Sequence, residues 1–436
     1  MPAAATKFPL TITEIAGQSI VELARKFGTP LFVYDGAIVA ERIADLAAFD
    51  VVRYAQKASS NLAILDIVRR NGGVVDAVSA GEIQRALAAG FKGGFNEPPE
   101  IVYTADIFDR EALELVAKHE IPVNCGSPDM IDQYGAVCPG RGITLRINPG
   151  FGHGHSQKTN TGGQQSKHGI WHTQLAECVE RAKRNKLSIA GLHMHIGSGT
   201  DMEHLSQVCG ALEQAALSVG SSIHSISAGG GLPTPYREGD TKVDIAAYYE
   251  LWNGVRERLA AAFGHAVSLE IEPGRYLSAE SGSLIAEIRA VKQMGDNLFY
   301  VVDAGFNNLA RPILYGAYHP MAVAYANGEP IGENSEPRGS SPRPATQQVI
   351  VGGPLCESGD IFTQEDGGYV RSRELPVAAI GDFMVIGVAG AYGSVMGSNY
   401  NSKPLAAEVL IENGKVHLVR ERQTFADIIR GEHIPK

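Results

Sequence analysis

VVRYAQKA, residues 51–58, is the stretch that decides the fold class, because it is a short apolar run with a lysine near its end. Further short runs suited to buried parallel strands follow it, and segments typical of helices or loops separate them. They are residues 73–79, 101–105, 121–127, 142–148, 189–196, 225–230 and 269–272. A strand followed by a helix, repeated eight times, predicts an α/β fold with a (β/α)8 barrel of the TIM type.

The pattern changes after about residue 285, where strand-like runs are joined by turns rich in Gly and Pro. Because few helical patterns lie between these runs, they predict a second, mostly β domain. We expect the barrel at residues 33–285 and the β domain at residues 286–436. Whether the N-terminal segment, residues 1–32, joins the β domain stays open at this point.

Composition and charge favour a soluble globular protein and argue against several other classes. The chain is 44% hydrophobic and 20% charged, which is enough apolar material for large cores. A net charge of -10 argues against a nucleic-acid partner. The five cysteines are an odd number without CxxC spacing, which favours reduced thiols in the cytoplasm over disulfides or zinc. We see no signal-peptide pattern, which argues against secretion. We also see no apolar run of about 18 residues, which argues against a membrane span.

Unusual polar residues collect at the ends of the predicted strands, where barrels of this type carry their reactive groups. Gly229, Gly230 and Gly231 end the seventh strand, where backbone N–H groups can approach a phosphate, although a tight turn explains them equally well. Glu272 ends the eighth strand and Arg275 follows it. This pair predicts either a buried ion pair, or a carboxylate for a protonated ring nitrogen beside a guanidinium for an anion.

Two other strand ends complete this set. Lys57 ends the first strand among largely apolar neighbours, so it is either a desolvated, nucleophilic amine or an ordinary surface lysine. His193 and His195 point to one side of the sixth strand. We expect no metal there, because further ligands have no obvious source. We favour one imidazole stacked on a flat ring, the other packed in the barrel, and Ser198 as a phosphate donor. Together these groups predict a pyridoxal 5'-phosphate site.

The predicted β domain supplies three more polar clusters, at residues 303–319, 353–360 and 390–401. The members that we place near a substrate are Arg311, Tyr315, Cys356, Glu357 and Tyr392. The alternative for Cys356 is a small buried hydrophobic residue, and the alternative for Glu357 and for Asp360 is a loop cap.

The segments YAQKASSN, HMHIGSG, GGGL, EPGR, CESGD and AYG…SNYNS occur in this order between about residue 31 and about residue 424. They resemble the fold-type III, or alanine-racemase-like, pyridoxal-phosphate-dependent decarboxylases, most closely the members that act on diaminopimelate. The resemblance implies a Schiff base at Lys57, ring stacking by His195 and pairing of Glu272 with the pyridine nitrogen. It also implies a further cofactor contact from Tyr392. The phosphate contacts that it implies come from Ser198, Gly229, Gly230, Gly231 and Arg275.

The same resemblance implies the substrate side of the site. Cys356 is expected to donate a proton, and the expected substrate-binding residues are Arg275, Arg311, Tyr315, Glu357 and Tyr392. The resemblance further implies a homodimer whose two active sites each combine residues of both chains, with Cys356 and Glu357 contributed across the interface.

The choice of substrate rests on which groups at the distal end of the substrate these side chains can bind. Arg311 can hold a distal carboxylate with two hydrogen bonds, and Glu357 can pair with a distal amine. Both groups occur in meso-2,6-diaminopimelate, so we expect a carboxy-lyase that forms L-lysine and CO2. Alternatives are decarboxylation of another basic amino acid or of a carboxylated polyamine precursor, and racemisation, which needs acid/base groups on both faces. A non-catalytic regulatory relative is disfavoured by Lys57, Glu272 and Cys356 occurring together.

One long loop lies on the catalytic side of the predicted barrel. Residues 150–169 follow the fifth strand and are rich in glycine and polar residues. This composition motivates the hypothesis of a lid that orders over the site.

Overall fold

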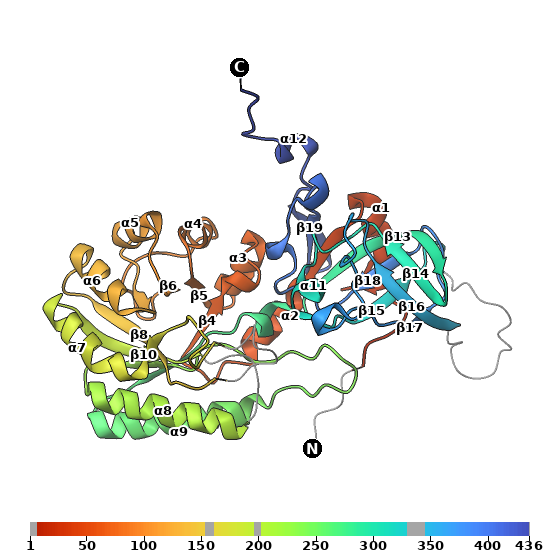
Figure 1. The fold of residues 1–436 in the computed structure, drawn as a ribbon. Coiled ribbons are helices and arrows are strands. Elements are labelled where there is room, and N and C mark those ends of the chain that lie inside the picture. Colours follow the sequence, from red (N-terminus) through yellow and green to blue (C-terminus); the bar gives the residue numbers. More distant parts are fainter. Residues whose placement is uncertain (1–6, 153–160, 196–201, 329–344, 436) are drawn as a thin grey trace. The chain divides into compact units, whose positions relative to one another are not determined.

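The chain folds into two compact units in the computed structural model, which describes residues 7–152, 161–195, 202–328 and 345–435 (Figure 1). The barrel unit comprises Val39–Thr234 and Val243–Leu277. The sheet unit comprises Met1–Ile38, Pro235–Lys242 and Ser278–Lys436. None of the helices in the described ranges combines the length and apolarity that crossing a bilayer requires.

Eight parallel strands form the closed barrel, which confirms the fold predicted from the sequence. Strands adjacent along the chain pair with one another, and the β12–β4 and β10–β8 pairings complete the ring. The strands are β4 (Val51–Ala55), β5 (Val74–Ala77), β6 (Ile101–Ala105), β7 (Val123–Cys125), β8 (Gly142–Asn148), β10 (Ser188–His193), β11 (Ser225–Ser227) and β12 (Ser268–Ile271). A short strand, β9 (Ile170–Trp171), pairs with the end of β8.

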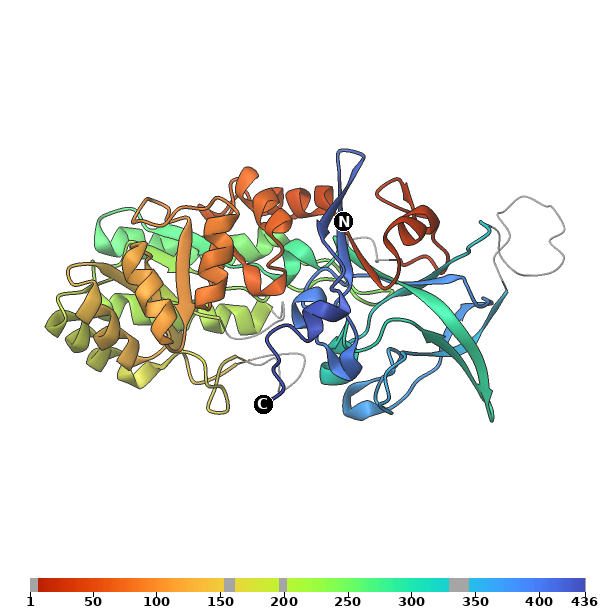
Figure 2. The ribbon, with the colours of Figure 1, turned by 90° about the horizontal axis from the view of Figure 1, so that it is seen from above.

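Helices follow the barrel strands and cover them from outside (Figure 2). They are α3 (Leu62–Arg70), α4 (Ala80–Ala88), α5 (Arg110–Lys118), α6 (Pro128–Val137), α7 (Leu175–Arg184), α8 (Met202–Val219), α9 (Ile245–Phe263) and α10 (Arg275–Ser278), with α2 (Gly36–Ala44) preceding β4. Their amphipathic sequences bury one face against the strands, as Ile64, Leu65 and Val68 of α3 do. Among the residues that the structure describes, the 3-10 turns η1 (Gln56–Ala58) and η3 (His172–Gln174) interrupt the pattern.

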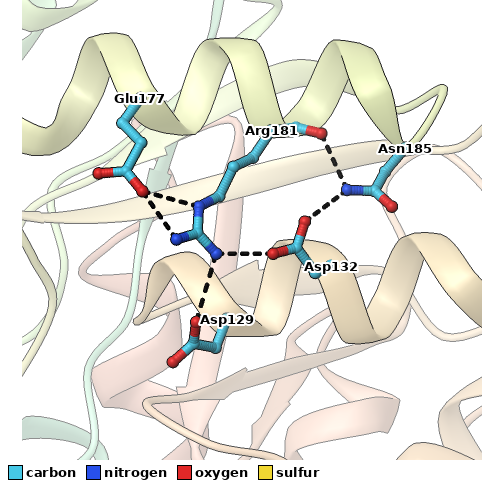
Figure 3. Close-up of polar contacts among 5 residues, drawn as sticks. All are labelled: Asp129, Asp132, Glu177, Arg181 and Asn185. Atoms are coloured by element: carbon cyan, nitrogen blue, oxygen red, sulfur yellow. Dashed lines mark hydrogen bonds and ion pairs between the residues drawn. The ribbon is translucent and has the colours of Figure 1, made fainter.

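The helices α6 and α7 are tied together by one arginine (Figure 3). Arg181 of α7 donates to Glu177 on its own helix, and to Asp132 at 2.6 Å and Asp129 at 3.3 Å on α6. Asn185 donates to Asp132 at 2.6 Å. This ionic cluster is structural, because every member of it pairs with another member.

The sheet unit is built around one long strand, β13 (Gly282–Met294), which pairs with β14, β18 and β3. The strand order is β17 (Arg373–Pro376), β16 (Thr346–Gly352), β14 (Asn297–Val302), β13, β3 (Leu31–Asp35), β19 (Ala407–Glu412) and β20 (Lys415–Arg420). Strand β18 (Phe383–Ile386) also pairs with β15 (Met321–Ala324). Among the described strands of this sheet, the pairings are antiparallel except β3–β19 and β14–β16.

Shorter elements complete the sheet unit. They are β1 (Glu14–Ile15), β2 (Gln18–Ser19), α1 (Ile20–Phe27), α11 (Arg311–Tyr315), α12 (Phe425–Ile428), η4 (Asp366–Gly368), η5 (Ser394–Met396) and η6 (Tyr400–Ser402). The apolar face of α1 packs with strands β3, β13, β18 and β19 in one core. The N-terminal segment is therefore part of this unit. Both β3 and β13 run across the domain boundaries that we expected at residues 32 and 285, because each is one continuous strand.

Candidate functional site

A layer of buried polar side chains lies at the carboxyl ends of the barrel strands. Its members are Asp76 on β5, Thr104 on β6, Asn124 on β7, Arg146 on β8, His193 on β10, Ser227 on β11 and Glu272 directly after β12. Within the described ranges, Oδ1 of Asp76 and Oδ1 of Asn124 have no hydrogen-bond partner. Because buried polar atoms normally have one, the layer is suited to holding a further polar molecule.

Glu272 is buried, and both of its carboxylate oxygens contact polar side chains. Ser227 donates to Oε1 at 2.7 Å, and Nε2 of His193 lies 3.1 Å from Oε2. Burial by itself raises the pKa of this carboxyl group, but His193 and Ser227 outweigh burial and lower the pKa below its ordinary value. Glu272 is therefore held as a carboxylate inside the barrel.

His195 is held as a neutral imidazole. Its Nδ1 accepts a hydrogen bond of 3.0 Å from the N–H of Gly230, so this nitrogen carries no proton. Burial lowers the pKa of His195 well below its ordinary value, and the positive charges of Arg146 and Lys57 lower it further. The ring lies parallel to that of His193, at an interplanar angle of 6° and a centroid distance of 6.5 Å. Among the described residues, these two histidines belong to no group of three metal-binding side chains.

The glycines after β11 are required by close packing between strand ends. Gly229 has a φ of +63°, and a Cβ there would lie 2.5 Å from the carbonyl oxygen of Met194. A Cβ on Gly230 would lie 2.4 Å from the carbonyl oxygen of Glu272. The N–H of Gly229 donates to Ser227, as that of Gly230 does to His195. Two of the three N–H groups expected at a phosphate are therefore used within the protein.

Lys57 lies in η1, directly after β4, and its side chain is exposed. From the sequence we considered that apolar neighbours exclude water from the Lys57 amine. In the single chain the amine is exposed, so this desolvation is absent. Its surroundings are also not uncharged, because its positive charge acts on the pKa values of Asp76 and Glu82. Burial raises the pKa of both carboxyl groups, and for Asp76 the charge of Glu272 raises it further. The sequence showed the lysine but not the acids around it.

Of two other barrel residues predicted for the site, the structure describes Arg275 but not Ser198. Arg275 begins α10, and the preceding Gly274 packs against the end of β4, where a Cβ would lie 3.1 Å from the carbonyl oxygen of Ala55. The N–H of Ala55 donates to the carbonyl of Pro273, so the segments of Lys57 and Arg275 lie side by side. Ser198 falls outside the described residues, and its expected role stays a prediction.

The described end of the 150–169 loop is firmly anchored to the barrel. Asn148 at the end of β8 donates to the carbonyls of Gly163 and His168 and accepts from the N–H of Gly163. Nδ1 of His168 lies 2.6 Å from Asp106, and Thr161 donates to the carbonyl of His195 at 2.9 Å. The returning part of the loop thus supports His195. Residues 153–160 lie outside the described ranges, so the lid hypothesis stays a prediction.

The sheet unit carries the remaining predicted residues. Arg311 and Tyr315 are the first and last residues of α11. Arg311 is buried and donates to Nε2 of His319 at 3.0 Å, while Tyr315 is half-buried. Tyr392 has a φ of +56°, in the left-handed region that bulky residues rarely adopt. Such backbone strain is concentrated at functional sites.

Cys356 and Glu357 lie on an exposed loop that other residues shape. The N–H of Cys356 donates to Oδ1 of Asn401 at 2.7 Å. Buried Asp360 accepts from the N–H groups of Leu355 and Phe306, each at 2.8 Å, so it caps the loop. The exposed thiol of Cys356 contradicts the alternative of a small buried hydrophobic residue.

Several residues that organise the site were missed by the sequence reasoning. Asp76 and Arg146 are single charges inside otherwise apolar predicted strands, and that pattern could have revealed them. Ser227 has the same kind of signal, but weaker. His319 and Asn401 end the polar clusters predicted at residues 303–319 and 390–401, but their sequence neighbourhood gives no sign of their partners.

The comparisons with known proteins agree with this geometry. Residues 38–279 match the family model described as pyridoxal-dependent decarboxylase, pyridoxal binding domain. The chain is 51% identical over 419 residues to diaminopimelate decarboxylase of Escherichia coli (strain K12), covering 96% of this chain and 97% of that protein. A crystal structure of diaminopimelate decarboxylase is similar with a TM-score of 0.89, at 51% identity over 94% of this chain and 95% of that one. The Helicobacter pylori diaminopimelate decarboxylase complexed with L-lysine has a TM-score of 0.79, at 29% identity over 94% and 98%.

Proposed function

Because the chain belongs to the pyridoxal-dependent decarboxylases, and within them to the diaminopimelate decarboxylases, we propose that it converts meso-2,6-diaminopimelate to L-lysine and CO2. In this reaction the bond between the D-configured α-carbon and its carboxylate breaks, and a proton takes the place of CO2. The observation that carries the proposal is the buried, ionised Glu272 inside the barrel.

Pyridoxal 5'-phosphate, when bound, supplies a ring that accepts the electron pair left by the departing CO2. The residues present fit this cofactor on three grounds. Within the described ranges the barrel interior has buried polar atoms without partners, Gly229 and Gly230 leave no room for side chains, and Glu272 offers a carboxylate to a protonated ring nitrogen. We propose that the cofactor is held by Lys57, His195, Ser198, Gly229, Gly230, Gly231, Glu272, Arg275 and Tyr392.

Each barrel residue has a distinct task in this proposal. Glu272 keeps a proton on the ring nitrogen, because a carboxylate of lowered pKa stays charged beside it. Neutral His195 offers a flat face without placing a second positive charge on the ring. Lys57 would hold the cofactor through Nζ, and Asp76 and Glu82, whose carboxyl groups interact electrostatically with that amine, would exchange a proton with it.

The substrate is assigned to the sheet-unit residues and to one barrel residue. We assign the distal carboxylate to Arg311 and the distal amine to Glu357, with further contacts from Tyr315, Arg275 and Tyr392. The Sγ of Cys356 delivers the proton that replaces CO2. The assignment of Arg311 is supported by its burial, because a buried guanidinium binds a carboxylate strongly.

Two broader features belong to the same proposal. We propose a homodimer in which Cys356 and Glu357 complete the active site of the other chain, and the exposure of both residues on one loop supports this. We also propose a cytoplasmic location, which the five free thiols support.

Product analysis tests the activity. Purified protein supplied with pyridoxal 5'-phosphate and meso-2,6-diaminopimelate should release equal amounts of L-lysine and CO2, and Lys57→Ala should release neither. Lysine, ornithine and arginine should be decarboxylated far more slowly. A preference for one of these three amino acids would contradict the assigned substrate.

A further inference from the structure

Arg311 is oriented by a histidine whose protonation is fixed by its surroundings. Nη1 of Arg311 lies 3.0 Å from Nε2 of His319, and Nδ1 of His319 lies 3.0 Å from the carbonyl oxygen of Gly387. A guanidinium only donates and a carbonyl only accepts. The imidazole therefore carries its hydrogen on Nδ1 and presents a lone pair on Nε2, and His319 is a neutral acceptor aimed at Arg311.

An aromatic ring supports the same guanidinium from a second direction. Cζ of Arg311 lies 4.8 Å from the ring centroid of Tyr236. The ring of Tyr236 in turn meets that of His319 edge to face, at 5.4 Å and 82°. The acceptor nitrogen of His319 and the ring of Tyr236 thus orient the guanidinium of Arg311, and neither adds a negative charge beside it.

The backbone of His319 is itself held in place by a stacked layer. Nη1 of Arg373 donates to the carbonyl of His319. Arg373 and Arg237 both lie over the ring of the adjacent Tyr318, with Cζ at 3.8 Å and 4.8 Å from its centroid. His319 is 0% exposed, so its ring has little freedom to turn away from Arg311.

We propose that His319 is a positioning residue that sets substrate specificity, because it fixes Arg311 for the distal carboxylate of the substrate. This inference rests on the role proposed above for Arg311. A carboxylate in the place of His319 would compete with the substrate for the guanidinium, whereas a neutral imidazole holds the guanidinium and leaves its charge intact. The contribution of His319 is thus to affinity for the distal carboxylate and not to bond breaking.

Three substitutions separate the acceptor from the rest of the side chain. His319→Gln keeps an acceptor near the position of Nε2, His319→Asn is too short to reach Arg311, and His319→Phe keeps a ring beside Tyr236 without an acceptor. In the holoenzyme, the Asn and Phe variants should raise the KM for meso-2,6-diaminopimelate at least about tenfold, or about 1.4 kcal/mol. Their kcat should change less than about threefold, and His319→Gln should keep its KM within about threefold of the wild type.

Two ligands that differ by one carboxylate give the decisive comparison. L-Lysine retains the distal carboxylate after decarboxylation, and 1,5-diaminopentane lacks it. By titration calorimetry, His319→Asn should bind L-lysine at least about tenfold more weakly than the wild type and 1,5-diaminopentane within about twofold of it. Equal weakening of both ligands, or a Gln variant as weak as the Asn variant, would overturn the positioning role.

The same data distinguish this inference from the proposed function. A wild type that forms lysine, with variants that bind lysine as tightly as it does, contradicts the inference alone. A wild type that neither binds lysine nor releases it from meso-2,6-diaminopimelate contradicts the proposed function, and the inference fails with it. Melting temperatures of all three variants show whether a loss of binding reflects a loss of folding.

Discussion

Glu272 remains charged in the barrel because its neighbours outweigh the cost of burial. Ser227 and His193 contact its two oxygens, and each favours the carboxylate over the acid. Asp76 has the opposite balance, because burial and the charge of Glu272 both raise its pKa. The pKa values of these two carboxyl groups are thus shifted in opposite directions, which is the arrangement that separates a charge partner from a proton donor.

Replacing the ionised carboxylate tests its role. Glu272→Gln keeps the shape and the hydrogen bond from Ser227 but removes the charge that would hold a proton on the ring nitrogen. We expect kcat to fall about 100-fold or more, while the cofactor stays bound. Steady-state kinetics together with the absorbance of the bound cofactor check both statements. Unchanged turnover in this variant would contradict the ring-nitrogen assignment.

The raised pKa of Asp76 predicts how stability depends on pH. The folded state keeps this proton at a pH where the unfolded chain has lost it, so Asp76 lowers stability as pH rises above about 4 toward its raised folded pKa. Asp76→Asn removes this effect, and without cofactor it should raise the melting temperature at pH 7 by about 2 °C or more. The gain should shrink as the pH approaches 4. Asp296→Asn, at an exposed turn, is the matched control for the loss of one carboxylate.

The close approach of helices α6 and α7 in the barrel unit depends on the side chains between them. The helices α6 and α7 are joined by Arg181 and its acidic partners (Figure 3). At the same contact, α6 has Gly135, where a Cβ would lie 2.4 Å from Cβ of Asn185. The glycine therefore sets the spacing at which the ionic cluster can form.

A pair of glycine substitutions tests this spacing. Gly135→Ala should destabilise the protein by about 1–3 kcal/mol, because the added methyl group forces the two helices apart. Gly210→Ala, in α8, meets no atom within 4 Å and should stabilise by about 0.5–1 kcal/mol. Urea unfolding of both variants measures the difference. Two variants of equal stability would show that the helices adjust at no cost.

Over the whole molecule, the sequence predicted the barrel much better than it predicted the site. All eight strands were found, because buried parallel strands leave a continuous apolar signal in the chain. The acids around Lys57 and the histidine behind Arg311 were missed, because each pairing depends on the tertiary fold and not on local spacing. The glycine turn was expected to serve a phosphate, and close packing of strand ends explains two of its three residues.

The proposed dimer predicts that two inactive variants restore each other. Lys57→Ala and Cys356→Ala should each be nearly inactive. If an active site combines Lys57 of one chain with Cys356 of the other, mixed dimers contain one intact site, and random mixing should recover about 25% of wild-type activity. Activity assays after co-expression of the two variants measure the recovery. No recovery despite demonstrated mixed dimers would show that each site is built from one chain.

The position of β3 has a consequence for synthesis on the ribosome. This strand pairs with β13 on one side and with β19 on the other, yet it leaves the ribosome before the whole barrel unit and before both of its partners. During translation its edges have no native partner, and the barrel can fold while β3 waits. Nascent chains stalled after β12 should therefore contain a protected barrel and a protease-sensitive N-terminus, which becomes protected only when β19 has emerged.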